Sequence, residues 1–311
     1  MELITGENDK GRRLDRVLRK ALPDHPLPLI HRLLRQGQVL VDGKPGKAQD
    51  RLDCGVKISI FSLKNAQKSN NLVRSLPPPN IIWEDSGLLS VNKPAGLAVH
   101  GPGSLDAMVR SFLTGKLPPS LSFSPGPLHR LDKPSSGIVV FSTSLKGARL
   151  FSSLLHERKV RKTYLAIVEG RVEKEEIWRD CLIRDKEKKK TFVSKAGSDG
   201  ACGETSGKTA ITKITPLAAK GNYSLIEAEI PTGRTHQIRA QAAAHGHPLA
   251  GDVKYSPQKT PRKAARDIYH KANFFLHAWK LEFLEFSIEA PLPEAFQEKV
   301  AALFNYAFLS E

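Results

Sequence analysis

The chain has 311 residues, of which 40% are hydrophobic and 26% are charged. This composition excludes a disordered chain, and no apolar run approaches the ~20 residues that a membrane-spanning helix needs. Lys and Arg outnumber Asp and Glu by 48 to 32, a net charge of +16. We therefore expect a cytoplasmic, two-domain protein whose partner is a polyanion such as nucleic acid; a charge that serves only solubility is the alternative.

The N-terminal region, residues 1–63, predicts a small basic domain. Apolar residues at helical spacing predict a helix over 14–22 and a shorter one over 30–34, and strands are expected at 39–41 and 56–60. Contact with nucleic-acid phosphates is the expected task, which adds affinity but little sequence information. A generic αβ domain with a solvated basic face is the alternative. The expected RNA contacts in this region are Arg13, Arg16, His31, Arg32, Arg35 and Lys44.

A proline-ended stretch, residues 64–80, predicts a semi-rigid linker to a second domain at 81–311. Strands in this second domain are mixed with separated helices rather than alternating regularly, which predicts an α+β fold. The expected strands lie within 81–94 (two, around a turn), 138–142, 163–170 and 223–230, and the expected helix includes 150–155.

Two stretches, 184–208 and 256–272, combine basic residues with small polar ones and are predicted to be insertions. Each is either a basic finger that touches RNA or a solvated loop. The three cysteines are far apart and form no CxxC pair, which fits a reducing compartment and argues against a disulfide framework or a zinc site.

A reactive carboxylate is the strongest chemical signal. Asp132 follows a His-Arg pair and leads into a small polar turn before the expected strand at 138–142. An ionised aspartate can act as a nucleophile or a base, and a nearby arginine favours that form. Two alternatives remain: Asp132 caps a turn and pairs with Arg130, or Ser135 or Ser136 is a hydrolase nucleophile, although neither lies in a G-x-S-x-G elbow.

A series of motifs resembles the pseudouridine synthases of the RluA type. HRLDKPSSG, at 129–137, is similar to their HRLDxxTSG signature, with Ser135 where the family usually has threonine. The N-terminal stretch IHRLLRQGQVLVDGKP resembles the S4 RNA-binding module, and this layout is most similar to the branch that modifies large-subunit ribosomal RNA. The other family motifs follow in order: VNKPAGLAVH at 91–100, KTYLA at 162–166, TGRTHQIR at 232–239, GHPLAGD at 246–252 and LHA at 276–278.

The resemblance implies a catalytic domain with a mixed, largely antiparallel sheet, plus a small N-terminal S4-like domain. It implies isomerisation of uridine to pseudouridine in structured RNA of the 23S type. The attachment of uracil moves from N1 to C5 without redox change or an added atom, so no cofactor is expected. Whether Asp132 adds to the base, attacks the sugar or takes a sugar proton stays open. The alternative function is an inactive RNA-binding factor for ribosome assembly; in either case we expect a monomer.

Three residues have roles at the target base by this resemblance. Tyr164 is expected to stack on a flipped uracil, since flipping costs a few kcal/mol and stacking on an aromatic ring is worth ~1–3 kcal/mol per base; a plain core tyrosine is the alternative. Leu276 is expected to supply an apolar wall. Arg130 is expected either to fill the space that the base leaves or to bind phosphate.

Arg234 is expected to be the counter-charge of Asp132. On a helix, Arg239 would lie ~140° away and would meet phosphate or structure instead. His129 is counted among the RNA contacts, although it and His236 are also expected to hold active-site loops by hydrogen bonds. No metal is expected at the histidines of these motifs, which are His129, His236, His245 and His247.

Overall fold

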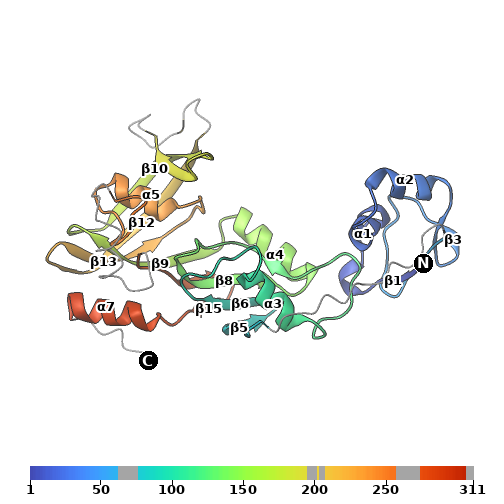
Figure 1. Cartoon of the computed structure of the whole chain (residues 1–311), viewed down its shortest axis with the longest axis horizontal. Helices are drawn as coiled ribbons and strands as arrows, with labels where there is room; N and C mark the ends of the chain where they lie inside the picture. Colours follow the sequence, from blue (N-terminus) through green and yellow to red (C-terminus); the bar gives the residue numbers. More distant parts are fainter. Residues whose placement is uncertain (62–75, 195–201, 203–206, 257–273, 306–311) are drawn as a thin grey trace.

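A computed structural model of the chain describes residues 1–61, 76–194, 202, 207–256 and 274–305 (Figure 1). Much of the predicted linker and most of the predicted insertion at 256–272 therefore lie outside the described residues. None of the described helices is long and apolar enough to cross a lipid bilayer.

The N-terminal part pairs two helices with a four-stranded sheet, at one end of an elongated molecule (Figure 1). Leu14, Val17 and Leu18 face the core at helical spacing, and Ile58 and Ile60 of the last strand meet them there. The two predicted helices and two predicted strands are confirmed. The elements are β1 (Glu2–Ile4), α1 (Leu14–Ala21), α2 (Leu27–Arg35), β2 (Val39–Val41), β3 (Lys44–Pro45) and β4 (Lys57–Ile60), with the strand order β1-β4-β2-β3.

The larger part is built on an eleven-stranded sheet in the order β11-β10-β12-β13-β9-β14-β8-β6-β5, with β15 beside β14 and β7 beside β8. Among the described pairs only β14 and β8 run parallel, so the predicted α+β fold with a mixed, largely antiparallel sheet is confirmed. The strands are β5 (Ile81–Asp85), β6 (Leu88–Lys93), β7 (Gly126–Pro127), β8 (Ser136–Ser142), β9 (Arg161–Glu169), β10 (Glu176–Asp185), β11 (Lys190–Val193), β12 (Lys208–Lys220), β13 (Tyr223–Glu229), β14 (Leu276–Phe283) and β15 (Phe286–Glu289).

Strand β9 is buried on both faces because separate hydrophobic clusters cover them. Tyr164 and Ala166 point to one cluster, and Leu165 and Ile167 point to another. This alternation directs the Tyr164 ring toward the side of the sheet where the HRLD motif lies. The covering helices are α3 (Leu105–Leu113), α4 (Leu145–His156), α5 (Gln237–Ala244) and α7 (Glu294–Phe304).

The parallel pairing of β8 with β14 depends on a glycine. Gly137 pairs with Ala278 and has a φ of 107°, and an added Cβ would collide with the backbone of Ala278. No other residue fits this approach without strain. The glycine that ends the HRLDKPSSG motif therefore brings the loop of Asp132 beside the strand that starts at Leu276.

The structure describes residues 184–194 of the first predicted insertion largely as a β-hairpin, because β10 and β11 pair antiparallel from Asp185↔Lys190 to Leu182↔Val193. Cys181 of β10 forms a disulfide with Cys202, with Cα atoms 5.0 Å apart, so the prediction of no disulfide was wrong. Their separation of 21 residues carried no signal, because β-sheet pairing of Cys181 with Thr209 is what brings the two together.

The N-terminal part and the larger part are joined by hydrogen bonds through a short 3-10 helix, Glu7–Asp9. The fully buried Asp9 carboxylate accepts hydrogen bonds from the backbone N–H groups of Leu121 and Ser122, both at 2.9 Å, and from the hydroxyls of Ser120 and Ser122. Asn8 Oδ1 accepts from the N–H of Leu145 at the start of α4. These contacts hold the N-terminal part against the larger sheet.

Candidate active site

Asp132 lies where three adjoining cavities meet. It occupies the loop between β7 and β8, and together with Arg130 and His236 it lines cavities of about 70, 620 and 340 Å³. The Asp132 side chain is 17% exposed. A substrate in the open cleft can therefore reach a carboxylate that protein otherwise surrounds.

The counter-charge of Asp132 is Arg239, not Arg234. Arg239 Nη1 donates to Asp132 Oδ2 at 2.9 Å, whereas Arg234 Nε donates to the carbonyl of Thr209 at 3.1 Å. The predictions for both arginines were thus wrong, and Arg239 is buried rather than free for RNA. The helical argument failed because α5 begins only at Gln237, so Arg234 lies in the turn before it.

A second carboxylate fixes the Arg239 guanidinium. Asp252 accepts from Arg239 Nε at 2.7 Å and from Nη2 at 2.9 Å, and its side chain is 1% exposed. The rings of Tyr255 and Phe274 lie 5.0 and 4.5 Å from the guanidinium carbon. Burial acts to lower the pKa of Arg239, but the hydrogen bonds and charges of Asp252 and Asp132 raise it. The result is a fixed chain of charges, Asp132–Arg239–Asp252.

His236 faces the other oxygen of Asp132. It has a left-handed φ of 54°, and its Nε2 lies 3.7 Å from Asp132 Oδ1. Its Nδ1 lies 2.8 Å from the Tyr255 hydroxyl and 3.5 Å from Arg184, which can only donate. Nδ1 is therefore an acceptor, and the imidazole proton sits on Nε2, toward Asp132. Burial lowers the pKa of His236 to about 4 although Asp132 opposes this, so the ring is neutral at pH 7.

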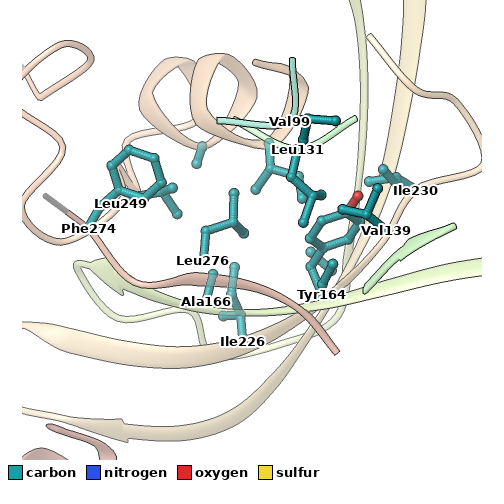
Figure 2. Close-up of a cluster of buried hydrophobic side chains, with 14 of the residues drawn as sticks. Val99, Leu131, Val139, Tyr164, Ala166, Ile226, Ile230, Leu249, Phe274 and Leu276 are labelled. Carbon is teal, nitrogen blue, oxygen red and sulfur yellow. The ribbon is translucent and has the colours of Figure 1, made fainter. Parts of the chain in front are cut away.

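Apolar side chains from the main core cluster wall the innermost cavity. Tyr164 and Leu276, both 7% exposed, line it together with Leu131 and Ile230, and Figure 2 shows these four side chains in one cluster. Burial, helped by the charge of Asp132, raises the pKa of the Tyr164 phenol, which keeps it neutral. Leu276 thus lines the cavity that contains Asp132, and its role as an apolar wall for the base stays a prediction.

A buried lysine ties the loop of Asp132 to its neighbour. Lys93 Nζ donates to the carbonyls of Pro94 and Leu97, both at 2.9 Å, and of Lys133 at 3.2 Å. Burial lowers the pKa of Lys93 to about 8, while the charge of Asp132 acts to raise it. Lys93 thus holds two loops in register and places a positive charge near Asp132.

The serines of the alternative hydrolase reading are not arranged for nucleophilic attack. Ser136 Oγ lies 2.8 Å from His277 Nδ1, but both side chains are buried and neither lines the cavities that contain Asp132. His277 Nε2 lies 3.1 Å from the carbonyl of Ala290 rather than from a carboxylate. Ser136 and His277 thus form a hydrogen bond inside the core. Ser135 does line the smallest cavity, but it makes no hydrogen bond to a histidine among the described residues.

The expected RNA contacts lie in different environments. His129 accepts from the N–H of Val140 at 3.1 Å, which is the predicted loop-holding bond, and burial lowers its pKa to about 3. Arg130 is exposed at the cleft. In the N-terminal part Arg13 pairs with Asp15 at 2.8 Å and His31 is half-buried. The remaining expected contacts are exposed: Arg16, Arg32, Arg35 and Lys44.

Three residues of the site had no predicted role. Lys93 lies in the motif VNKPAGLAVH and Asp252 lies in GHPLAGD. Each is a charged residue among apolar residues and glycines, and this contrast is the signal that could have identified it. Tyr255 belongs to no motif. Of the histidines, His245 lies 3.0 Å from Asp180 and His247 lies 3.2 Å from the carbonyl of Glu169.

Comparison with known proteins identifies a family that this chain matches. The family model described as RNA pseudouridylate synthase matches residues 87–244, which include Asp132, Tyr164 and Arg239. The chain is 33% identical over 303 residues to ribosomal large subunit pseudouridine synthase D of Neisseria meningitidis, covering 91% of this chain and 76% of that protein. It is 28% identical over 310 residues to ribosomal large subunit pseudouridine synthase C of Escherichia coli K12, covering 96% and 95%.

A solved structure shares the fold. Human RNA pseudouridylate synthase domain containing 4 superposes with a TM-score of 0.56 at 24% identity, over 71% of this chain and 91% of that one. The Asp132 loop and the sheet that carries Tyr164 thus belong to a fold shared with a distant relative.

Proposed function

The chain belongs to the RNA pseudouridylate synthase family, and we propose that it isomerises specific uridines to pseudouridine in large-subunit ribosomal RNA, with Asp132 as the essential carboxylate. The observation that carries the proposal is the ion pair of Asp132 with Arg239 at the floor of an open cleft, beside Tyr164. The names of the relatives, which act on the large ribosomal subunit, support the choice of RNA.

The arrangement suits a reaction at a base turned out of its stack. The glycosidic bond from N1 breaks and a bond from C5 to the same sugar carbon forms, while N1 gains a proton and C5 loses one. Atoms and electrons balance within the nucleotide and solvent, so no cofactor is required. Arg239 holds the Asp132 carboxylate in place, and Tyr164 with Leu276 gives the uracil an apolar face on which to stack.

Mapping pseudouridine in an unmodified large-subunit ribosomal RNA transcript tests the proposal. We expect new carbodiimide-dependent reverse-transcription stops with the wild-type protein and none with Asp132→Asn, which keeps the shape but removes the charge. Ser136→Ala should leave the stops in place, whereas a serine hydrolase would show the opposite pattern. Transfer RNA and a large-subunit particle are tested in parallel. RNA binding without modification of any of the three would favour the ribosome-assembly factor instead.

A further inference from the structure

The lining of the 620 Å³ cleft carries an excess of positive charge. Among the described residues that line this cleft, Asp132 alone carries a carboxylate, and Arg239 already neutralises it. The cationic side chains of the lining are Arg130, Arg158, Lys162 and Arg234, and three histidines, His129, His156 and His236, also line it. None of the four cationic side chains makes an ion pair within the described part of the chain. A cavity of this kind is suited to an anion.

Lys162 and Arg234 form the inner end of this wall. Lys162 is half-buried on β9, and burial together with the charge of Arg234 lowers the pKa of its ammonium group. Arg234 Nε donates a hydrogen bond to the Thr209 carbonyl, and its two terminal nitrogens have no hydrogen-bond acceptor among the described residues. Two like charges are thus held close together and partly out of water, an arrangement that costs free energy unless an anion joins them.

The position of Lys162 relative to Tyr164 indicates which anion fits. The two residues are two positions apart on β9, so their side chains leave the same face about 6.6 Å apart along the strand, and both line the cleft. A base stacked on Tyr164 would place its own sugar–phosphate backbone beside Lys162. Arg158, which follows α4, extends the same wall toward solvent. Arginine forks match phosphate oxygens well, and lysine adds a point charge.

We propose that Lys162, Arg234 and Arg158 bind a backbone phosphate of the RNA next to the target nucleotide. This inference rests on the proposed function, because it names the part of the substrate that the same cleft takes. It also reverses the two arginine roles expected from the sequence: Arg239 serves the carboxylate, and Arg234 serves the phosphate.

Binding of a short oligouridylate, measured against salt concentration, tests the site without turnover. Lys162→Met and Arg234→Gln should each weaken binding on the order of tenfold, and should reduce the slope of log K against log salt by about 0.7, the value for one phosphate on a single strand. Lys174→Met, which removes an exposed lysine outside the cleft, should change neither. Wild-type affinity and slope in both cleft variants would overturn the proposal.

Thermal unfolding separates binding from a structural role. Lys162→Met removes an unpaired, half-buried charge and keeps the side-chain volume, so its Tm should equal or exceed that of the wild type while its RNA affinity falls. A Tm that falls together with affinity would assign Lys162 to the fold and overturn the proposal. If Lys162→Met weakened the binding of a polyglutamate peptide as much as it weakened the binding of RNA, the proposal would also be overturned, because the site would then accept any anion.

The same data distinguish failure of the site from failure of the activity. If the wild-type protein makes no pseudouridine but the salt slope responds to Lys162→Met, the phosphate site stands and the catalytic proposal falls. If the wild-type protein makes pseudouridine but Lys162→Met leaves the salt slope unchanged, the catalytic proposal stands and the phosphate site falls.

Discussion

Charge at the active site is organised by one guanidinium that serves two carboxylates. Arg239 uses Nη1 for Asp132 and both Nε and Nη2 for Asp252, so its fork is fully engaged. A buried charge is stable only when it is paired and hydrogen-bonded, and here each partner depends on the next. The orientation of the Asp132 carboxylate is therefore set by Arg239 and, through it, by Asp252.

Replacing Arg239 by lysine should separate geometry from charge. An ammonium group cannot bridge both carboxylates in this fixed arrangement, so we expect Arg239→Lys to lower turnover by about 100-fold, the scale of a displacement of about 1 Å at a reacting group. Arg234→Lys, which keeps its charge at the cleft wall, should lower turnover far less. Single-turnover rates of pseudouridine formation measure both. Equal losses for the two variants would contradict the assignment of the counter-charge.

Asp252 should act through Arg239 and not through the RNA. Asp252→Asn keeps an acceptor oxygen but removes the charge that balances Arg239, so we expect turnover to fall by about 10- to 100-fold while RNA affinity stays within twofold. Asp180→Asn is the matched control, because Asp180 also pairs with a neighbour, His245, outside the site. A loss of RNA affinity as large as the loss of turnover would argue against a positioning role.

The candidate catalytic carboxylate is easier to predict from the sequence than its partner. Asp132 is marked by its motif, and Tyr164 and Leu276 are marked by theirs. The counter-charge is not, because the choice between Arg234 and Arg239 depends on where α5 starts and on the left-handed conformation of His236. Backbone conformation at one residue changes which face of the helix meets Asp132, and side-chain identity alone does not reveal it.

At the scale of elements, the β10–β11 hairpin supports the site from outside. The buried Thr191 N–H donates to the Tyr255 hydroxyl at 2.9 Å, and Thr191 Oγ1 donates to the carbonyl of Thr235 at 2.9 Å. Tyr255 in turn contacts His236 and Arg239. A segment predicted to be an insertion is thus hydrogen-bonded to Tyr255, which contacts the two residues that face Asp132.

Removing one hydroxyl should weaken this support. Tyr255→Phe leaves the Thr191 N–H buried without an acceptor, so we expect the free energy of unfolding to fall by about 1–3 kcal/mol and turnover to fall several-fold. Tyr223→Phe, which alters a half-buried tyrosine of β13, should cost less than 1 kcal/mol. Urea unfolding and single-turnover assays measure the two effects, and equal unfolding free energies for both variants would contradict the role of the hydroxyl.

Strand alternation explains why some elements are predictable and others are not. The apolar runs of β8 and β9 stand out because both faces are buried. The β10–β11 hairpin is not recognisable in the same way, because Lys186, Lys188 and Lys190 give its tip the composition of a solvated loop. Only the antiparallel pairing with β10 shows that β11 is a strand.

For the molecule as a whole, three histidines should make stability depend on pH. Burial lowers the pKa of His129 to about 3 and of His236 and His277 to about 4, against an ordinary value of 6.5. Folded protein therefore holds them neutral, and the unfolded chain takes up protons first as pH falls. This stability is present above pH 6.5 and is lost as pH falls, down to about 4 for His236 and His277 and to about 3 for His129, by at most about 1.4 kcal/mol per pH unit for each histidine.

Urea unfolding at pH 7, 6 and 5 measures this loss. His129→Gln should flatten the dependence, since one of the three histidines no longer titrates. His100→Gln is the control, because His100 is exposed. A free energy of unfolding that is constant from pH 7 to pH 5 would contradict the neutral, buried state of these rings.

The contact between the N-terminal part and the larger part could not be predicted from the sequence. Asp9 lies in a polar stretch that has the composition of a loop, and three of its partners are backbone N–H groups, which every sequence possesses. Yet four groups of residues 120–122 donate to this one fully buried carboxylate. Hydrogen bonding to the ionised form outweighs burial and lowers the pKa of Asp9.

Removing that carboxylate should release the N-terminal part. Asp9→Ala leaves buried hydrogen-bond donors without an acceptor, and each such donor destabilises the contact by about 1–3 kcal/mol. Interfaces between the parts of one chain are small, so a loss of this size should separate the two parts. We expect a larger radius of gyration in small-angle scattering, faster proteolysis between the two parts and weaker RNA binding, because phosphates would then be contacted by two tethered surfaces instead of one rigid one. Asp24→Ala, which removes an exposed carboxylate of the same part, should change none of these. If Asp9→Ala kept the wild-type radius and cleavage pattern, the apolar contacts of Leu121 with the N-terminal core would be sufficient to hold the parts together.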